Sequence, residues 1–330
     1  MAMSELIDRF GRTVSDLRIS VTDRCNFRCV YCMPEEGVAW APAETSLTPD
    51  EIHRLAGIFV ALGVQTVRLT GGEPLLRREI VDVVDRLHGD HPHIELSLTT
   101  NGFLLRRYAR RLAAAGLCRV NVSLDSLQPD RFARITRQNA LHVVLDGIDA
   151  AREAGLHPIK INVVVVRGFN DDELLAFAEL ARASDVAVRF IEYMPLDAGG
   201  EWGRESVVAG DELLEAAESA FPLVAHTTGP DPATRYTFAD GSRGELGFIN
   251  SVTAPFCDRC NRVRLTADGQ LRTCLFSVAE TDLRTPLRGG ATDAVLCDLI
   301  RDAVDRKESG HRIDAPDFVR PLRPMSQIGG

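Results

Sequence analysis

The sequence predicts an α/β fold built on a mainly parallel sheet. Short β-branched runs alternate with amphipathic segments through the first 200 residues, and several of these segments end at a glycine. Polar motifs directly follow the strands, at the edge where parallel sheets place their functional sites. Periodicity alone is compatible with an open doubly wound sheet and with a full or partial barrel.

Six strands are expected in this region, each rich in β-branched or aliphatic residues. They cover residues 17–21, 66–70, 94–99, 119–123, 159–166 and 186–192. The fifth is continuously apolar in its second half, which is typical of a parallel strand covered on both faces.

Five helices are expected to alternate with these strands, and a sixth lies nearer the C-terminus. They cover residues 49–62, 78–87, a segment ending at Gly116, 141–154, 172–183 and 294–306. Pro49 stands at the first helical position, and Gly63, Gly116 and Gly155 end their helices. The tail over residues 316–330 is rich in proline and glycine and is expected to be irregular.

Composition narrows the class of protein. Of the 330 residues, 45% are hydrophobic and 26% are charged, as in ordinary globular proteins. The net charge of −9 argues against broad nucleic-acid or membrane-surface binding. No apolar stretch is long enough for a membrane span, and no signal peptide is visible, so a cytoplasmic protein with reduced thiols is expected.

Six of the eight cysteines form two groups of three. The first trio is Cys25, Cys29 and Cys32; the second is Cys257, Cys260 and Cys274. Three thiolates are one short of a closed tetrahedral or cubane set, so the sequence suggests two metal centres, each with an open position. The remaining two, Cys118 and Cys297, are expected to be buried apolar thiols.

Several basic residues occupy positions that suit an anionic ligand. Arg18, Arg68 and Lys160 lie within predicted strands, where a charge without a partner is unusual. Arg262 and Arg264 have period-two spacing, which puts both on one face of an extended segment. A structural ion pair is the alternative role for each of these residues. For Arg189 in the sixth strand, anion binding and a structural ion pair are equally expected.

The first trio and the motif Gly71-Gly72-Glu73-Pro74 resemble the radical S-adenosylmethionine superfamily. The stretches 18–25, 68–74 and 257–265, together with the terminal Gly329-Gly330, resemble the GTP 3′,8-cyclase family of molybdenum cofactor biosynthesis. The resemblance runs from about residue 15 to the last residue. It implies a partial (βα)6 TIM-type barrel over residues 1–200 and a smaller C-terminal α+β domain over 201–330, and the glycines between Pro195 and Glu205 agree with that boundary.

The resemblance also implies roles for individual residues. The first trio would bind one 4Fe–4S cluster and the second trio another, whose open iron meets the guanine of GTP. The S-adenosylmethionine site would comprise Tyr31, Gly72, Ser123 and Met194. The GTP site would comprise Arg18, Arg68, Thr99, Lys160, Arg262, Val263 and Arg264. The C-terminal pair Gly329 and Gly330 would enter the active site and be needed for radical initiation.

The implied activity is that of a lyase. Reductive cleavage of S-adenosylmethionine gives a 5′-deoxyadenosyl radical that abstracts H3′ of GTP, and C3′ then attacks C8 to give the 3′,8-cyclised nucleotide. Implied partners are GTP, an electron donor and a downstream cyclic pyranopterin monophosphate synthase. Binding to nucleic acid or to a membrane is not expected. The oligomeric state can be a monomer or a homodimer. A peptide-modifying radical enzyme with two clusters and a non-enzymatic zinc-ribbon module are the alternatives.

Overall fold

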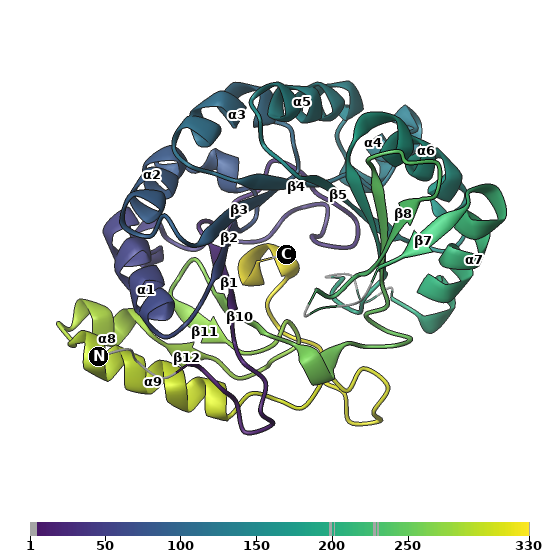
Figure 1. Ribbon diagram of the computed structural model, residues 1–330. Helices are drawn as coiled ribbons and strands as arrows, with labels where there is room; N and C mark the ends of the chain where they lie inside the picture. The colour runs from purple at the N-terminus through teal and green to yellow at the C-terminus, as the bar shows by residue number, and fades with distance from the viewer. Residues whose placement is uncertain (1–4, 198–199, 201, 227–228, 230, 330) are drawn as a thin grey trace.

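One curved sheet of twelve strands forms the centre of the computed structural model, which describes residues 5–197, 200, 202–226, 229 and 231–329. The order across the sheet is β12-β11-β10-β1-β2-β3-β4-β5-β6-β9-β8-β7. Figure 1 shows that the sheet bends into an open arc with helices along its outer side. The predicted α/β fold is therefore confirmed, and its shape is that of a partial barrel.

The eight strands from β10 to β9 are parallel to their neighbours and form the barrel wall. Their bounds are β1 Asp16–Ser20, β2 Thr66–Thr70, β3 Glu95–Thr100, β4 Arg119–Ser123, β5 Ile159–Val165, β6 Ala187–Glu192, β9 Glu245–Ile249 and β10 Arg262–Leu265. Antiparallel strands complete the two edges: β7 Leu223–Ala225, β8 Thr234–Phe238, β11 Gln270–Arg272 and β12 Thr281–Asp282. All six strands expected from the sequence are present within two residues at either end.

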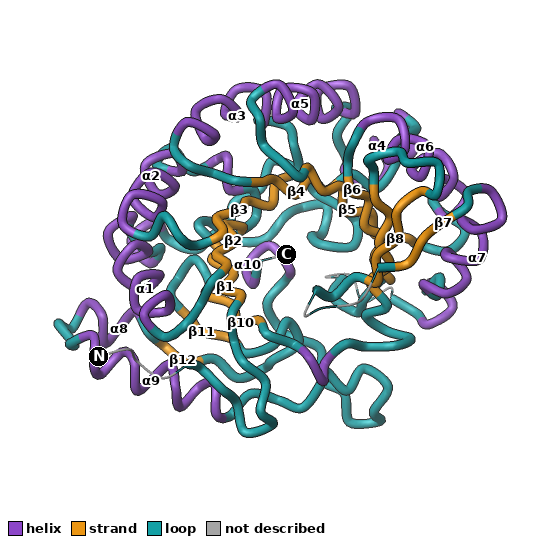
Figure 2. Tube along the Cα trace, viewed as in Figure 1, coloured by secondary structure: helices purple, strands orange, loops and turns teal. Residues whose placement is uncertain are grey.

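Helices cover the outer face of the wall, as Figure 2 shows. Their bounds are α1 Pro49–Ala61, α2 Ile80–Asp90, α3 Leu105–Ala114, α4 Pro129–Thr136, α5 Leu141–Glu153, α6 Leu174–Ser184, α7 Gly210–Ala220, α8 Arg284–Arg288 and α9 Asp293–Asp305, whereas α10 Met325–Ile328 lies inside the arc. Thr48 begins α1 with a capping box to Glu51, followed by Pro49, as the sequence signals predicted. The helices α4, α7 and α8 were not predicted.

The wall strands alternate between two environments. On β1, Leu17 and Ile19 are fully buried in the main hydrophobic core, which lies between the sheet and the outer helices. The intervening residues point into the barrel. Strand β5 follows the same alternation, so the expectation that both of its faces are covered by apolar packing is wrong.

Strands from the last third of the chain extend both edges of the barrel. Strand β9 pairs with β6 at one edge, and β10 pairs with β1 at the other, where Asp16 lies opposite Arg262 and Arg18 opposite Arg264. The C-terminal residues thus add strands to the sheet rather than forming a second sheet. No helix in the described ranges is both long and apolar enough to cross a membrane.

The C-terminal tail turns back into the barrel. Figure 2 shows α10 inside the arc, surrounded by the strands of the wall. Ser326 and Ile328 are buried, and Ile328 packs in a small second core with Leu196 and Phe276. The expectation of an irregular tail is therefore wrong for Met325–Ile328, which form a short helix.

Candidate active site

The inner face of the barrel is polar rather than filled with aliphatic side chains. Cross-strand register brings its residues together in rows, with Arg18 between Arg68 and Arg264, and Asn121 between Thr99 and Lys160. Closed TIM barrels fill this space with branched apolar residues. An open barrel with polar walls can instead hold a polar ligand.

Most arginines of this inner face have no acidic partner. In the part of the chain that the structure describes, no carboxylate oxygen lies within 4.0 Å of the guanidinium groups of Arg18, Arg68, Arg262 or Arg264. Among the described residues, the buried Nε atoms of Arg18, Arg68 and Arg262 have no hydrogen-bond partner. Burial and the charges of Arg264, Arg68 and Arg262 push the pKa of Arg18 well below its usual range. A group of buried, mutually repelling cations favours an anionic ligand.

Two further basic residues face carboxylates. Arg189 is buried and forms an ion pair with Glu245. Lys160 Nζ lies 3.9 Å from Asp231 Oδ2, and burial, together with Arg189 and Arg119, lowers the pKa of Lys160 to about 8. Lys160 therefore belongs to the same charged wall, whereas Arg189 is partly neutralised.

The first trio lies in the loop that follows β1, at the carboxyl edge of the barrel. Phe27 anchors this loop in the core between Phe103 and Phe132, with ring centroids 6.0 Å from each. The backbone N–H of Phe27 donates to Cys25 Sγ at 3.4 Å, and Asn101 Nδ2 lies 3.9 Å from the same sulfur. N–H donors directed at thiol sulfur are typical surroundings of an iron–sulfur centre.

All three thiols of the first trio resist ionisation. Burial raises the pKa of Cys25 to about 11 and that of Cys32 to about 12, and it also raises the pKa of Cys29. The Glu73 carboxylate adds to the rise at Cys25, and Asp125 adds to it at Cys29. Metal binding would have to displace these protons.

The residues predicted for the S-adenosylmethionine site surround the first trio at the strand ends. Tyr31 donates a 2.6 Å hydrogen bond to Asp125 beyond β4, and Ser123 ends β4. Gly72 passes so close to the backbone of Asp23 and Arg24 that a Cβ would lie 2.3 Å from the Arg24 carbonyl oxygen. Only glycine allows this loop to approach the cysteine loop so closely.

Met194 lies on the opposite side of this mouth. It follows β6 and packs against the small core that contains Ile328. The side chain therefore borders the tail as well as the strand ends.

The second trio lies at the amino edge of the barrel. Cys257 and Cys260 precede β10, and Cys274 follows the antiparallel β11, so all three lie at the edge opposite the first trio. Arg262 Nη2 lies 3.9 Å from Cys260 Sγ. Burial would raise the pKa of Cys260, but Arg262 and Lys307 hold it at about 7.

The tail connects the two edges. The Ser326 N–H donates to the Cys32 thiol, and Arg264 donates to the Gly329 carbonyl. Gly329 has φ +78°, and a Cβ there would lie 2.6 Å from Ser20 Oγ. Gly330, the other predicted tail residue, lies outside the described residues.

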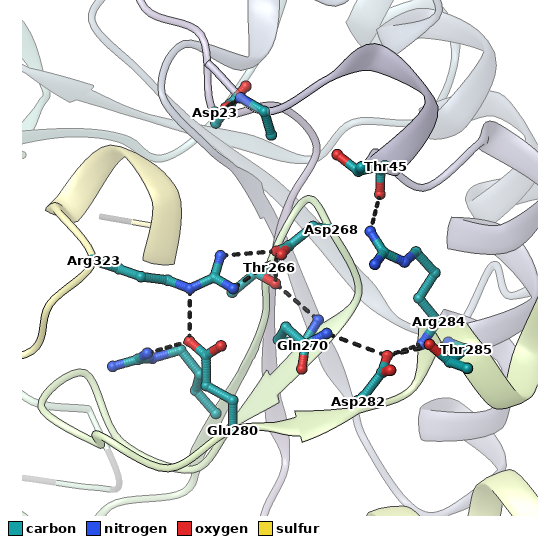
Figure 3. Close-up of polar contacts among 12 residues, drawn as sticks. Asp23, Thr45, Thr266, Asp268, Gln270, Glu280, Asp282, Arg284, Thr285 and Arg323 are labelled. Carbon is teal, nitrogen blue, oxygen red and sulfur yellow. Dashed lines mark hydrogen bonds and ion pairs between the residues drawn. The ribbon is translucent and has the colours of Figure 1, made fainter. Parts of the chain in front are cut away.

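An arginine fixes the entry of this tail, as Figure 3 shows. Arg323 forms two hydrogen bonds to Asp268, of 3.0 and 2.9 Å, and its Nε lies 2.9 Å from Glu280. Asp268 also accepts from Thr266, at the end of β10. The anchor joins the tail to the strand that carries Arg262 and Arg264.

Each trio offers three of the thiolates that a cubane cluster needs, and in such a cluster each thiolate binds a different iron. No three His, Cys, Asp or Glu side chains in the described ranges converge closely enough to hold one metal ion. β1 has five residues, a length of about 16 Å at about 3.3 Å per residue. A nucleotide in the barrel could therefore reach from one centre toward the other.

The remaining predictions have mixed outcomes. Val263 is fully buried in the outer core, so a ligand in the barrel could contact only its main chain. Thr99 accepts a 3.4 Å hydrogen bond from Asn121 on the inner face. Cys297 is buried as expected, but the expectation for Cys118 is wrong, because that thiol is exposed.

Sequence reasoning missed two charged residues at the site. Asp16 is half-buried beside the inner-face arginines, and although desolvation raises its pKa, Arg68 and Arg18 hold that pKa below its usual value. Its position two residues before Arg18 on β1 was a signal that could have revealed it. Lys307, beside the second trio, was overlooked although the chain has only one other lysine.

Two family models match consecutive parts of the chain. Residues 19–181 match the Radical SAM superfamily, and residues 186–313 match Molybdenum Cofactor Synthesis C. Among curated proteins, the chain is 51% identical over 329 residues to a GTP 3′,8-cyclase of Streptomyces coelicolor, covering 98% of this chain and 96% of the relative. It is 48% identical to a GTP 3′,8-cyclase of Rhodopirellula baltica, covering 98% and 92%.

Solved structures with low sequence identity share the fold. Streptococcus suis SuiB bound to S-adenosylmethionine superposes with a TM-score of 0.61 at 13% identity, over 89% of this chain and 69% of that one. SuiB bound to its precursor peptide SuiA gives 0.58 at 15% identity, over 79% and 60%.

Proposed function

The chain belongs to the GTP 3′,8-cyclase family of radical S-adenosylmethionine enzymes, and from that premise we propose how its barrel holds the two reactants. As a member of this family it is a lyase that acts in the first step of molybdenum cofactor biosynthesis, with S-adenosylmethionine and 4Fe–4S clusters as cofactors. GTP enters the barrel with its phosphates on the inner-face cations and its base toward the second trio. The observation that carries this proposal is the row of unpaired arginines between the two trios.

The residues of the first trio would hold one cluster, with Tyr31, Gly72, Ser123 and Met194 around the S-adenosylmethionine. When bound and reduced, this pair supplies the 5′-deoxyadenosyl radical that abstracts H3′ of GTP. The protein then has two tasks: to fix the ribose close to the radical and to exclude water. The tail supports the second task, because α10, whose residues Ser326 and Ile328 are buried, lies inside the arc (Figure 2).

Arg18, Arg68, Lys160, Arg262 and Arg264 would bind the nucleotide. Arginine offers planar donors that match phosphate oxygens, and the low exposure of these groups strengthens each contact. The second trio would hold a cluster whose open iron takes the guanine. With base and phosphates held, C3′ of the substrate radical is placed to attack C8 of the same molecule.

Anaerobic incubation with GTP, S-adenosylmethionine and dithionite tests the proposal, with mass analysis for 5′-deoxyadenosine and the cyclised nucleotide. Formation of both, in equal amounts, is the expected result. 5′-Deoxyadenosine without a cyclised nucleotide, at saturating GTP and with both centres loaded, would contradict it. The electron donor and a cyclic pyranopterin monophosphate synthase as the next enzyme remain part of the proposal. The peptide-modifying and zinc-ribbon alternatives are not retained, because near-full-length relatives are GTP 3′,8-cyclases.

A further inference from the structure

Lys307 occupies an unusual place for a lysine. The chain has 38 basic residues, and all except Lys160 and Lys307 are arginines. Lys160 faces the barrel interior, whereas Lys307 follows the end of α9 and is only 2% exposed. Lysine is rarely buried to this extent without a partner.

The Lys307 ammonium is bound to the two chain segments that carry the second trio. It donates a 2.9 Å hydrogen bond to the carbonyl of Arg262 and another to the carbonyl of Thr273. Arg262 lies two residues after Cys260, and Thr273 directly precedes Cys274. An ammonium has three N–H donors, so these two carbonyls leave one donor available.

Among the described residues, Lys307 has no ion-pair partner. Within the described ranges, no carboxylate oxygen lies within 4.0 Å of Lys307 Nζ. Taking an ion out of water costs several kcal/mol unless an opposite charge lies nearby. The groups on which Lys307 acts electrostatically are the sulfur atoms of Cys260 and Cys274.

We propose that Lys307 is the counter-cation of the second iron–sulfur centre and raises the reduction potential of that centre. The inference rests on the proposed function, since it takes the second trio as cluster ligands. Three thiolates give a bound cluster negative charge, and the potential of such a cluster depends on the net charge and hydrogen bonds around its sulfur atoms. A fixed ammonium stabilises the reduced form more than the oxidised form.

Other charged residues also lie near the second trio. Arg262 Nη2 lies 3.9 Å from Cys260 Sγ, and the Glu308 carboxylate opposes the effect of Lys307 on Cys274. The Glu308 side chain accepts hydrogen bonds from Thr273 at 2.7 Å and Ser277 at 2.5 Å. Arg12 donates to the carbonyl of Cys257 at 2.7 Å and is paired with Asp8 at 2.6 Å. Because this pair has no net charge, its joint removal by Asp8→Asn and Arg12→Met is a control that perturbs the same trio without changing the charge around it.

The test compares Lys307→Met, Lys307→Arg and the double variant Asp8→Asn/Arg12→Met. Each is made in a chain whose first trio is changed to serine, so that only the second centre binds iron. After anaerobic reconstitution, iron is counted and the midpoint potential is measured by redox titration followed by electron paramagnetic resonance. We expect a more negative potential for Lys307→Met, and values near that of the parent for Lys307→Arg and for the double variant.

An unchanged potential in a Lys307→Met protein that carries four irons would overturn the inference. If Lys307→Met binds no iron, the iron content of Lys307→Arg is decisive. Iron binding by Lys307→Arg supports a role of the positive charge at this position. Loss of iron from both variants, with unchanged thermal unfolding, would show that packing rather than charge matters and would overturn the inference. A parent chain without iron would instead contradict the second centre of the proposed function itself.

Discussion

The two cysteine trios offer the same ligands in opposite electrostatic surroundings. Around the first, the Glu73 and Asp125 carboxylates raise the thiol pKa values further than burial alone. Around the second, burial raises the pKa values of Cys257 and Cys274, but Arg262 and Lys307 bring the pKa of Cys260 down to about 7. Ligand identity therefore does not distinguish the two centres, whereas charge does.

This difference matches the ligand that each centre would meet. S-adenosylmethionine carries a sulfonium cation, which acidic neighbours favour, and GTP is an anion, which basic neighbours favour. The carboxylates are themselves tightly held: Glu73 accepts from Leu75, Thr100 and Asn101, and burial raises its pKa to about 7. The barrel thus has an acidic mouth and a basic interior.

The largest expected effect is a different product pattern when a cysteine of one or the other trio is replaced. Cys25→Ser should abolish 5′-deoxyadenosine formation, because the first centre can no longer bind and reduce S-adenosylmethionine. Cys260→Ser should still form 5′-deoxyadenosine but no cyclised nucleotide. Mass analysis of both products measures this, and normal cleavage by Cys25→Ser with a loaded second centre would contradict the assignment.

The next effect concerns the basic interior. Arg264→Ala should weaken GTP binding by roughly 30- to 150-fold, since a buried charge-assisted hydrogen bond contributes about 2–3 kcal/mol. Uncoupled S-adenosylmethionine cleavage should persist. Calorimetric titration with GTP measures the affinity, and Arg106→Ala on the outer helix α3, whose partner is Asp146, is the control. An unchanged dissociation constant for Arg264→Ala would remove this residue from the GTP site.

A third test uses pH to probe the same interior. The pKa of Lys160 is about 8 before GTP binds, and phosphate raises it in the complex because it favours the ammonium. GTP affinity should therefore be highest below about pH 8 and fall by up to about tenfold per pH unit above it. Titrations from pH 7 to 9.5 measure this fall, and Lys160→Arg should flatten it, because arginine keeps its charge. An equal slope in both proteins would exclude Lys160 as its cause.

The smallest effect concerns the tail that joins the two regions. Arg323→Ala should loosen residues 325–329 by about 1 kcal/mol, the contribution of a partly exposed bidentate pair. Hydrogen exchange at these amides measures the change, and Arg312→Ala is the matched control, because its pair with Asp317 is exposed. Equal exchange in both variants would mean that Arg323 does not anchor the tail.

Local sequence signals predicted the wall of the barrel well. Strand β2 was placed at its observed residues, and α1 begins at Pro49, because caps, glycines and alternation are encoded within a few residues. The inner-face cations were found for the same reason, since Arg18 and Arg68 interrupt apolar strands. The short α4 also begins at a proline, Pro129, followed by Asp130, so its start signal was present and was missed.

Long-range pairing could not be predicted in the same way. Nothing local indicates that β10 lies beside β1 while β9 lies beside β6, so the C-terminal strands were assigned to a domain but not to the two edges. The helix α10 was missed because it has only four residues, and its burial depends on a distant second core. The exposure of Cys118 was likewise decided by tertiary position rather than by residue type.

The pairing of Asp16 with Arg262 also sets an order of events during synthesis on the ribosome. Strand β1 is synthesised early, but the edge that pairs with β10 stays unpaired until residues 262–265 have been made. Interruption of translation after α7 would therefore leave an intermediate with one exposed sheet edge on each side, because neither β9 nor β10 has been made.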